Sequence, residues 1–286
     1  MPVTTSLRRK SRLGPNNCIS RLAWAERVGS LSCMARVKLA NIVTYCNRTL
    51  KPNSFEDWPG AVNGLQMENH GSVSHIAAAV DATPATVKKT IETGADLLVV
   101  HHGLFWGTTH PWTENRYQLL KLLLENNVAV YSSHLPLDAH PQIGNNAILC
   151  KALGIKSPKP FFIDRDPPIG LRGELNISRL QLAKLLTKAT GVEPIVLPCG
   201  KSRCRKIGIV TGGAGTDMKK AANEGVDTFI TGEGPHWTFA LAEDLGLNVF
   251  YGGHYATETF GVKALSERLS KKFKIPWTFI DHPSGL

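Results

Sequence analysis

Short apolar runs alternate with amphipathic segments of about ten residues from residue 34 to the end of the chain. The apolar runs predict buried strands, and the segments with apolar residues three and four apart predict helices. The predicted strands are 74–80, 96–100, 128–132, 171–175, 195–197, 206–211, 227–231, 248–251 and 277–280. The predicted helices are 34–50, 84–93, 116–126, 145–153, 179–190, 217–223, 236–245 and 257–272. This alternation implies crossover connections, and therefore an α/β fold whose largely parallel or mixed sheet is covered on both faces.

Two stretches interrupt this pattern. Residues 55–66 contain Trp-Pro-Gly and Asn-Gly turn signals, and residues 156–172 are rich in Pro and Asp. We interpret 156–172 as the connection between two lobes, one formed by about 34–155 plus a C-terminal segment and the other by about 171–247. Residues 1–33 show neither period, so we expect a disordered basic leader, or a start codon placed ahead of Met34.

The two predicted lobes share a repeat. Residues 94–103 align with 225–234, and each segment leads through a helix to a strand that ends at a histidine, His134 or His254. An acidic residue lies four positions after each histidine, Asp138 in the first lobe and Glu258 in the second. We infer two related lobes that face each other across a pseudo-twofold axis, with a site that collects side chains from both.

The strongest candidates for chemistry follow the predicted strands. His101 and His102 lie at the end of 96–100, Asp138 follows 128–132, and His254 and Glu258 follow 248–251. The carboxyl ends of parallel strands form the ligand crevice of α/β sheets, so we expect these side chains to meet. Imidazole and carboxylate ligands without thiolate suit zinc, manganese, iron, cobalt or nickel, and five ligands suit two ions better than one. The alternative for each residue is a turn or a helix cap.

A second set of residues is predicted to assist this site. His134 is a candidate ligand, second-layer donor or proton shuttle, and Glu233 with His236 is a candidate acid/base pair, against the alternative that Glu233 caps a helix. Gly212, Gly213 and Gly215 lie where a strand turns into a helix. Such a turn can present backbone N–H groups to a phosphate, although a tight turn explains the same glycines.

The composition of the chain excludes few classes of protein. With 42% hydrophobic and 20% charged residues, the chain resembles an ordinary globular protein, and no apolar run reaches the length of a membrane-spanning helix. The net charge is +10, but residues 1–33 carry half of that excess, which argues against nucleic-acid binding by the folded part. The six cysteines form no Cys-x-x-Cys. We therefore expect a reducing, cytoplasmic location, or a mitochondrial or plastid one if residues 1–33 are a transit peptide.

The chain resembles the GTP cyclohydrolase 1 type 2 homologues, also called the NGG-interacting factor 3-like proteins. The matching stretches are 63–66, 94–102, 133–138, 144–145, 212–215, 231–233 and 253–258. The resemblance implies a three-layer α/β/α architecture of two interlocked lobes, a ring-shaped homohexamer and a dinuclear metal centre. The family's metal ligands fall on His101, His102, Asp138, His254 and Glu258. Longer members carry a domain between the lobes, and 156–172 is too short for it, so this chain resembles the short form.

These observations favour a hydrolase in which a metal-activated water attacks a nucleotide or related small-molecule substrate. With GTP, hydroxide would attack the imidazole carbon of guanine and release formate. One alternative is a metal-dependent phosphoesterase that uses the same pair of ions. The other is a non-catalytic metal-binding protein that acts in regulation through a protein partner.

Overall fold

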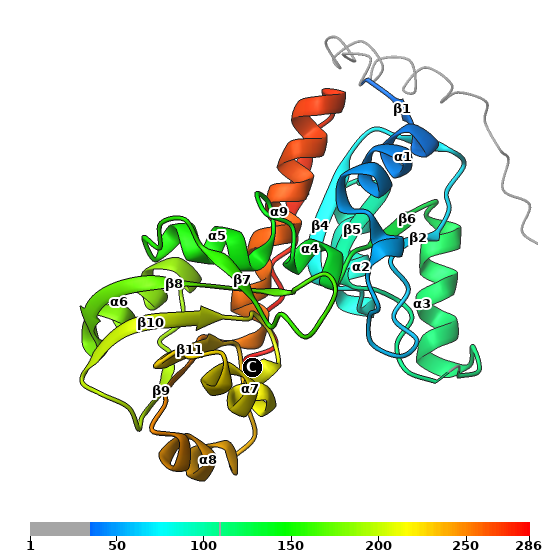
Figure 1. Ribbon diagram of the computed structural model, residues 1–286. Coiled ribbons are helices and arrows are strands. Elements are labelled where there is room, and N and C mark those ends of the chain that lie inside the picture. The colour runs from blue at the N-terminus through cyan, green and yellow to red at the C-terminus, as the bar shows by residue number, and fades with distance from the viewer. Residues whose placement is uncertain (1–34, 109) are drawn as a thin grey trace, which may run out of the picture. The chain divides into compact units, whose positions relative to one another are not determined.

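The computed structural model describes residues 35–108 and 110–286 (Figure 1). The predicted leader 1–33 lies outside this part of the chain. Ala35–Leu286 forms one unit built on two large sheets and a two-stranded antiparallel pair, β1-β3. The strands are β1 (Val37–Lys38), β2 (Gly64–Met67), β3 (Ser72–Val73), β4 (Ile76–Asp81), β5 (Leu97–His102), β6 (Ala129–Ser132), β7 (Lys159–Phe161), β8 (Gly170–Ser178), β9 (Ile195–Pro198), β10 (Arg203–Ile209), β11 (Thr228–Thr231), β12 (Asn248–Tyr251) and β13 (Trp277–Phe279).

Nine α-helices connect and cover these strands within the described residues. They are α1 (Leu39–Leu50), α2 (Pro84–Glu92), α3 (Glu114–Glu125), α4 (Leu135–Asp138), α5 (Asn145–Ala152), α6 (Arg179–Thr190), α7 (Met218–Asn223), α8 (Thr238–Leu245) and α9 (His254–Phe273). Two 3₁₀ helices lie at Pro52–Ser54 and Ala214–Asp217. None of the helices in the described part of the chain is long and apolar enough to cross a membrane.

The two sheets repeat one arrangement. The first has the order β13-β4-β5-β6-β2, and the second has the order β7-β8-β10-β11-β12-β9. Each contains three adjacent parallel strands, β4-β5-β6 or β10-β11-β12, with an antiparallel strand, β2 or β9, beside the last of them. The added strand precedes the three in the chain in both cases. The predicted α/β fold with mixed sheets is therefore confirmed.

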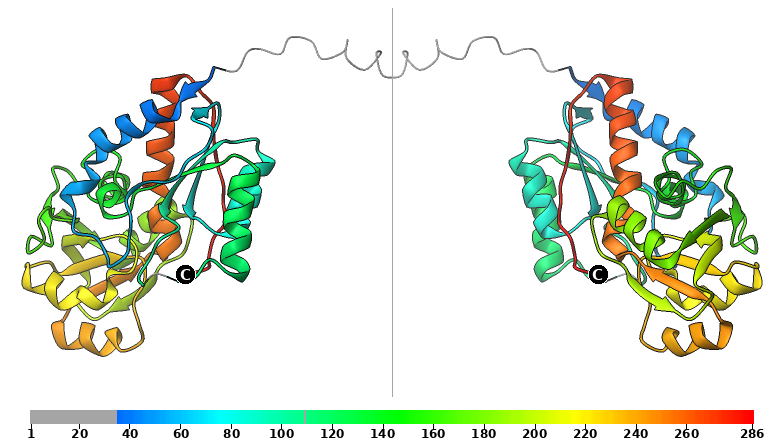
Figure 2. Two further views of the ribbon diagram at one scale, coloured as in Figure 1. Left: turned by 90° about the vertical axis from the view of Figure 1, so that its right-hand side faces the viewer. Right: turned by 90° about the vertical axis from the view of Figure 1, so that its left-hand side faces the viewer.

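Helices cover both faces of each sheet, because alternate strand residues point to opposite sides. In the first sheet, Ile76 and Ala78 pack in the cluster that includes residues of α1 and α9, whereas Ala77 and Ala79 pack with residues of α2 and α3. In the second sheet, one cluster joins α5 and α6 to the strands and the other joins α7 and α8. Helix α9 contacts β4, β5 and α5, and Figures 1 and 2 show it running beside the first sheet from a start near the second.

Several element boundaries differ from the prediction, and two of the differences lie at the candidate site. Strand β5 continues through His101 and His102, because His102 still pairs in register with Asp81 of β4. Helix α9 begins at His254, three residues earlier than predicted, after Gly253 with φ +87°. Helix α4 and strands β1, β2, β3 and β7 were not predicted. They are two to four residues long, too short for a period to emerge from the sequence.

Candidate metal centre

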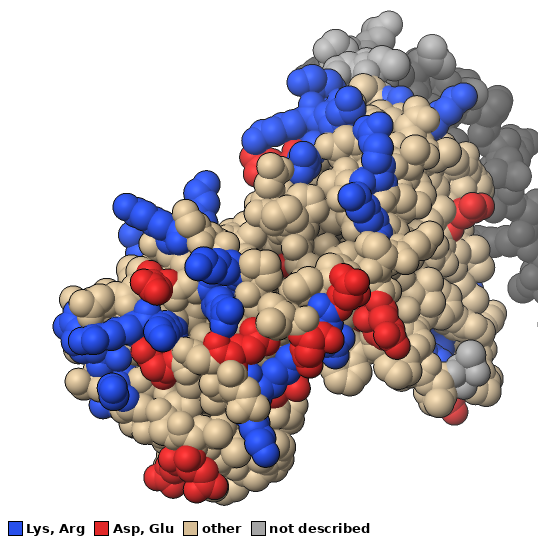
Figure 3. All heavy atoms as spheres, in the orientation of Figure 1, with Lys and Arg blue, Asp and Glu red and all other residues tan. Residues whose placement is uncertain are grey.

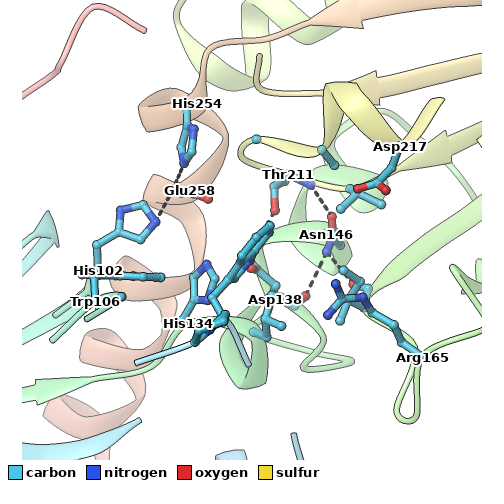
Figure 4. Close-up of a pocket in the computed structure, with 18 residues that line it drawn as sticks. His102, Trp106, His134, Asp138, Asn146, Arg165, Thr211, Asp217, His254 and Glu258 are labelled. Atoms are coloured by element: carbon cyan, nitrogen blue, oxygen red, sulfur yellow. Dashed lines mark hydrogen bonds and ion pairs between the residues drawn. The ribbon is translucent and has the colours of Figure 1, made fainter. Parts of the chain in front are cut away.

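Five predicted ligands converge where the carboxyl ends of the central strands approach α9. Figure 4 labels four of them, namely His102, Asp138, His254 and Glu258. β5 supplies His101 and His102, the short helix α4 supplies Asp138, and the first turns of α9 supply His254 and Glu258. His254 and Glu258 lie four residues apart, so they share one face of the helix. The sequence separations between these elements are large, and the repeated sheet arrangement is what brings them to one place.

One group of candidate ligand atoms is fully buried. It consists of His101, Asp138 and Glu258, whose ligand atoms lie within 4.8 Å of one another. The Nε2 atom of His101 lies 3.4 Å from Asp138 Oδ2 and 3.5 Å from Glu258 Oε1. Two donors on one tetrahedral ion at 2.0–2.2 Å are separated by roughly 3.3–3.6 Å. The spacing in this group therefore matches the first coordination shell of an ion.

A second group shares Glu258 with the first. It consists of His102, His254 and Glu258, again with ligand atoms within 4.8 Å of one another. Glu258 Oε2 lies 3.3 Å from His102 Nε2 and 3.2 Å from His254 Nε2. The two oxygens of one carboxylate thus face two different sets of imidazoles, which is the arrangement of a bridging ligand.

Two buried polar atoms at this point make only ion-pair contacts of 3.2–3.5 Å with the other candidate ligands, within the described part of the chain. His101 Nε2 and Glu258 Oε2 are inaccessible to solvent and make no hydrogen bond to any described residue. Burying such an atom without a partner costs roughly 1–3 kcal/mol, so native proteins rarely leave one unsatisfied without a functional reason. Nitrogen and oxygen donors without thiolate suit divalent transition ions. The residues present therefore fit a metal.

The second ring nitrogen of each candidate histidine is held by a neighbouring oxygen. His101 Nδ1 lies 2.9 Å from the carbonyl oxygen of Ser133, and His102 Nδ1 lies 2.8 Å from Asp81 Oδ1. His254 Nδ1 lies 2.8 Å from Glu233 Oε1. An acceptor at Nδ1 fixes the tautomer that leaves Nε2 free to ligate, and metal-binding histidines almost always have one.

The carboxylate of Asp138 is also oriented. Its Oδ1 accepts hydrogen bonds from Asn145 Nδ2 at 2.7 Å and from Thr211 Oγ1 at 3.2 Å. The other oxygen, Oδ2, remains directed at His101. Asn145 Oδ1 in turn accepts the backbone N–H of Gly261 in α9 at 2.6 Å, which ties α5, α4 and α9 together around the site.

The close approach of imidazoles and carboxylates shifts the pKa values of these groups in the metal-free chain. Burial lowers the pKa of His101, but the carboxylates of Asp138 and Glu258 outweigh it and hold that pKa well above its usual value. Burial also opposes the charge on His254, and Glu258 and Glu233 raise its pKa to about 9. Burial raises the pKa of Glu258, but the surrounding imidazoles outweigh it and hold that pKa well below its usual value. At neutral pH His101 and His254 therefore carry protons that a cation must displace.

His134 lies beside the two groups, but it does not group with Glu258, the carboxylate that the two groups share. Its ring centroid lies 4.9 Å from that of His101, and its ligand atom groups with those of His101 and His102. His134 Nδ1 lies 2.6 Å from Asp57 Oδ1, and its backbone N–H donates to Asn63 Oδ1 at 2.7 Å. Burial opposes the charge of Asp57, but His134 lowers the pKa of that carboxyl to about 2. Asp57 thus orients His134 with Nε2 available.

The predicted acid/base pair separates in the structure. Glu233 orients His254 through Nδ1, so it lies directly behind a candidate ligand. His236 is exposed just before α8 and lines none of the pockets found among the described residues. It is therefore not placed to move a proton at the two groups within this chain. The sequence pattern placed both residues after β11, but the chain turns outward at Gly234 and Pro235.

The glycine turn has a different physical basis from the predicted phosphate loop. The N–H groups of Gly212, Ala214 and Gly215 already donate to Thr257 Oγ1, Thr231 Oγ1 and the carbonyl of Glu233. Gly212 has φ +72°, and a Cβ there would collide with Glu258 Oε1. A Cβ on Gly215 would collide with the backbone at Glu233. Close packing against the ligand cluster thus requires glycine, and most of the predicted anion donors are engaged.

The two groups open into a pocket of about 640 Å³. Beyond the candidate ligands its walls include Trp58, Trp106, Arg165, Ile169 and Asp217. The ring of Trp106 stands edge-on to His102 and His134, at centroid distances of 5.4 and 4.9 Å. Among the described residues Arg165 is the only Lys or Arg in this lining. The pocket thus combines buried ligand atoms, an aromatic wall and one cation.

Sequence reasoning missed the residues that orient the ligands. These are Asp57, Asp81, Asn145 and Ser133, together with the pocket residues Trp106 and Arg165. Asp57 lies in the turn-rich stretch 55–66, and Ser133 and Asn145 lie in stretches that carry the family resemblance, but their orienting roles were not predicted. Asp81 ends a strand that was predicted to stop one residue earlier.

An α/β chain with two repeated sheets and a buried histidine–carboxylate cluster belongs to the class of candidate metal-binding α/β proteins. Comparison with known proteins is specific: residues 37–284 match Duf34/NIF3 (NGG1p interacting factor 3). The chain belongs to this family. The predicted membership is confirmed.

Relatives and solved structures agree with this assignment. Proteins named GTP cyclohydrolase 1 type 2 homolog from Halobacterium salinarum and Deinococcus radiodurans are 39% and 36% identical, over 87% and 86% of this chain and 99% and 93% of theirs. The structure of TTHA1606 from Thermus thermophilus has a TM-score of 0.81 at 38% identity and covers 87% of this chain and 100% of its own. Reduced HcgD from Methanocaldococcus jannaschii has a TM-score of 0.79 at 27% identity, with the same two coverages.

Proposed function

We propose that this chain binds two divalent ions side by side and uses them to hydrolyse a nucleotide or a related phosphate-bearing compound. One ion would be held by His101, Asp138 and Glu258, and the other by His102, His254 and Glu258. The observation that carries the proposal is that the two oxygens of Glu258 face two separate sets of ligand atoms. The names of the relatives point to the same reaction class.

The chain's own residues divide the work. Bound divalent ions supply Lewis acidity and lower the pKa of water that they contact toward neutrality. Asp81, Glu233 and the carbonyl of Ser133 hold the imidazoles in the ligating tautomer. His134, fixed through Nδ1 by Asp57, keeps Nε2 for a proton at the pocket wall. Such a positioned group typically contributes about 10²–10⁴-fold to the rate.

The side chains that line the pocket favour a particular class of substrate. Trp58 and Trp106 offer flat apolar surface to a ring, and Arg165 offers one guanidinium to an anionic group. A triphosphate would find a single cationic side chain among the described lining residues. This observation favours a compound with one phosphate group, and thus the phosphoesterase reaction, as the second candidate beside opening of the guanine ring of GTP.

Turnover tests the proposal. Protein of measured metal content is incubated with GTP and with a panel of nucleoside monophosphates and other phosphomonoesters. We expect hydrolysis that rises with metal content, and we expect His134→Gln to keep its metal while kcat falls by about 10²-fold or more. Full metal loading without turnover of any of these compounds would contradict the hydrolase and support a non-catalytic metal-binding protein.

Glu233→Gln tests the orientation of His254 separately from ligation. An amide can still face Nδ1, but it removes the charge that supports the imidazole, so we expect affinity at one of the two ions to fall by about 10–100-fold. Competition with a chelator measures it. Glu243→Gln, an exposed change in α8, is the matched control and should leave both affinities unchanged. Equal loss at both ions would show that Glu233 does not act through His254.

Metal binding should also release protons. The pKa of His101 lies well above its usual value and that of His254 is about 9, so both are protonated at pH 7 in the metal-free chain and must lose their protons to ligate. We expect affinity to increase as pH rises from 6 toward about 9. Calorimetry in two buffers of different ionisation enthalpy at pH 7 measures the release, and identical heats in the two buffers would contradict it.

Assembly into a ring-shaped homohexamer, which the family resemblance implies, stays a prediction. Light scattering of the purified chain measures it directly.

A further inference from the structure

A second pocket lies away from the metal groups and shares no described lining residue with the first. Its volume is about 490 Å³, and it is bounded by β7, β8, β10 and the end of α7. Four of its lining residues are cations, namely Lys156, Lys159, Arg172 and Lys206. Trp and the other aromatic residues do not line it, and Val226 is its one large apolar residue among the described positions. Charged side chains therefore form most of the lining of this pocket.

The sheet places two of these cations against each other. Lys159 of β7 and Arg172 of β8 are directly paired in the antiparallel register, so their side chains share one face of the sheet. Like charges opposite each other in a sheet are destabilising. Arg172 has a local reason for its place, because it donates to the carbonyl oxygen of Glu224 at the end of α7. Lys159 has no such contact among the described residues.

The two acids of the pocket offset only part of these charges. Both oxygens of Glu224 are engaged by backbone N–H groups, Oε2 by Phe162 and Oε1 by Ile163, each at 3.1 Å. Glu174 pairs in register with Lys206. Within the described part of the chain, none of the four cations has a carboxylate oxygen within 4.0 Å. The pocket therefore keeps a net positive charge.

The stretch of chain that supplies most of the pocket carries an excess of cations. Residues 151–210 contain twelve Lys and Arg but only four Asp and Glu. Figure 3 shows Lys and Arg side chains gathered over the α6 and β8 side of the face in view. A concave, aromatic-free and cationic pocket on such a surface attracts multiply charged anions and gives no surface on which a base could stack.

We propose that this pocket is a second binding site, which takes a small polyphosphate anion through Lys156, Lys159, Arg172 and Lys206. Phosphate oxygens would replace the missing carboxylate partners and relieve the repulsion between Lys159 and Arg172. The site is independent of the proposed hydrolysis, because its residues and those of the metal groups do not overlap.

Calorimetric titration of the whole chain with inorganic tripolyphosphate at low salt tests this proposal. We expect a saturable site whose affinity falls at least about tenfold in Lys159→Gln/Lys206→Gln. Both lysines are exposed, so the variant should unfold at the wild-type temperature, and Lys159→Gln alone should show a smaller loss. The control is Lys271→Gln/Lys272→Gln in the last turn of α9, which removes the same charge elsewhere.

Three results would overturn the proposal. The first is no saturable binding by the wild type, and the second is an equal loss in the α9 control, which would indicate diffuse charge attraction only. The third is loss of binding in Glu258→Ala, which would place the anion on the metal ions of the other pocket. Retained binding in that variant supports the separate site whatever the outcome of the turnover assay.

Discussion

Glu258→Ala is expected to abolish binding of both divalent ions at once. Its two carboxylate oxygens face separate sets of imidazoles, His101 on one side and His102 with His254 on the other. Without the shared carboxylate each group keeps only two of its three ligands, and the remaining imidazoles repel a cation when they are protonated. Metal analysis after dialysis should give two ions per chain for the wild type and none for the variant.

His254→Ala and Glu267→Ala complete this series. His254 belongs to one group only, so its variant should keep the ion held by His101 and Asp138. Glu267 lies on the same helix but is exposed and pairs with Lys271, so its variant should keep both ions and change stability by no more than about 0.5 kcal/mol. A Glu258→Ala protein that retains two ions would show that this carboxylate is not a bridge.

Gly212→Ala is expected to damage the same site without removing any ligand. Gly212 has φ +72°, and a Cβ at this position would occupy the place of Glu258 Oε1. The left-handed backbone costs an alanine roughly 1–2 kcal/mol, and forced displacement of a packed neighbour typically adds about 1–3 kcal/mol. We expect metal affinity to fall by about 100-fold or more, together with a lower free energy of unfolding in urea.

Gly191→Ala is the control that separates the strain of a left-handed backbone from the steric collision with Glu258. Gly191 ends α6 with φ +80°, and a Cβ there meets no atom within 4 Å. This variant should lose roughly 1–2 kcal/mol and keep its full metal content. If Gly212→Ala behaves in the same way, then the close approach of this turn to Glu258 does not position the carboxylate.

The sequence was sufficient to predict the fold and the candidate ligands, but it did not predict the residues that surround and orient those ligands. The period of apolar residues and the repeat were enough to place His101, His102, Asp138, His254 and Glu258 at or after strand ends that we expected to meet in one site. The orienting roles of Asp57, Asp81 and Asn145 were missed. Two of the contacts join residues 77 and 21 positions apart, and the third joins the neighbouring short helices α4 and α5, whose relative direction no period in the sequence predicts. Hydrogen bonds of this kind depend on tertiary packing, which a single sequence does not reveal.

The role of the glycine turn shows the same limit. Gly-Gly-Ala-Gly between a strand and a helix favours an anion site or a tight turn equally well from the sequence. Only the structure shows that Gly212 approaches Glu258 and that three of the N–H groups are already engaged. Conversely, the exposed position of His236 depends on the direction of one turn, which residue types alone do not determine.

The most direct test of the proposed metal pair is anomalous diffraction from crystals of the wild-type protein soaked with manganese or zinc. Two peaks about 3.5–4 Å apart are predicted, one beside His101 and Asp138 and the other beside His102 and His254, with Glu258 between them. A single peak, or no peak within reach of Glu258, would contradict the proposed pair of ions.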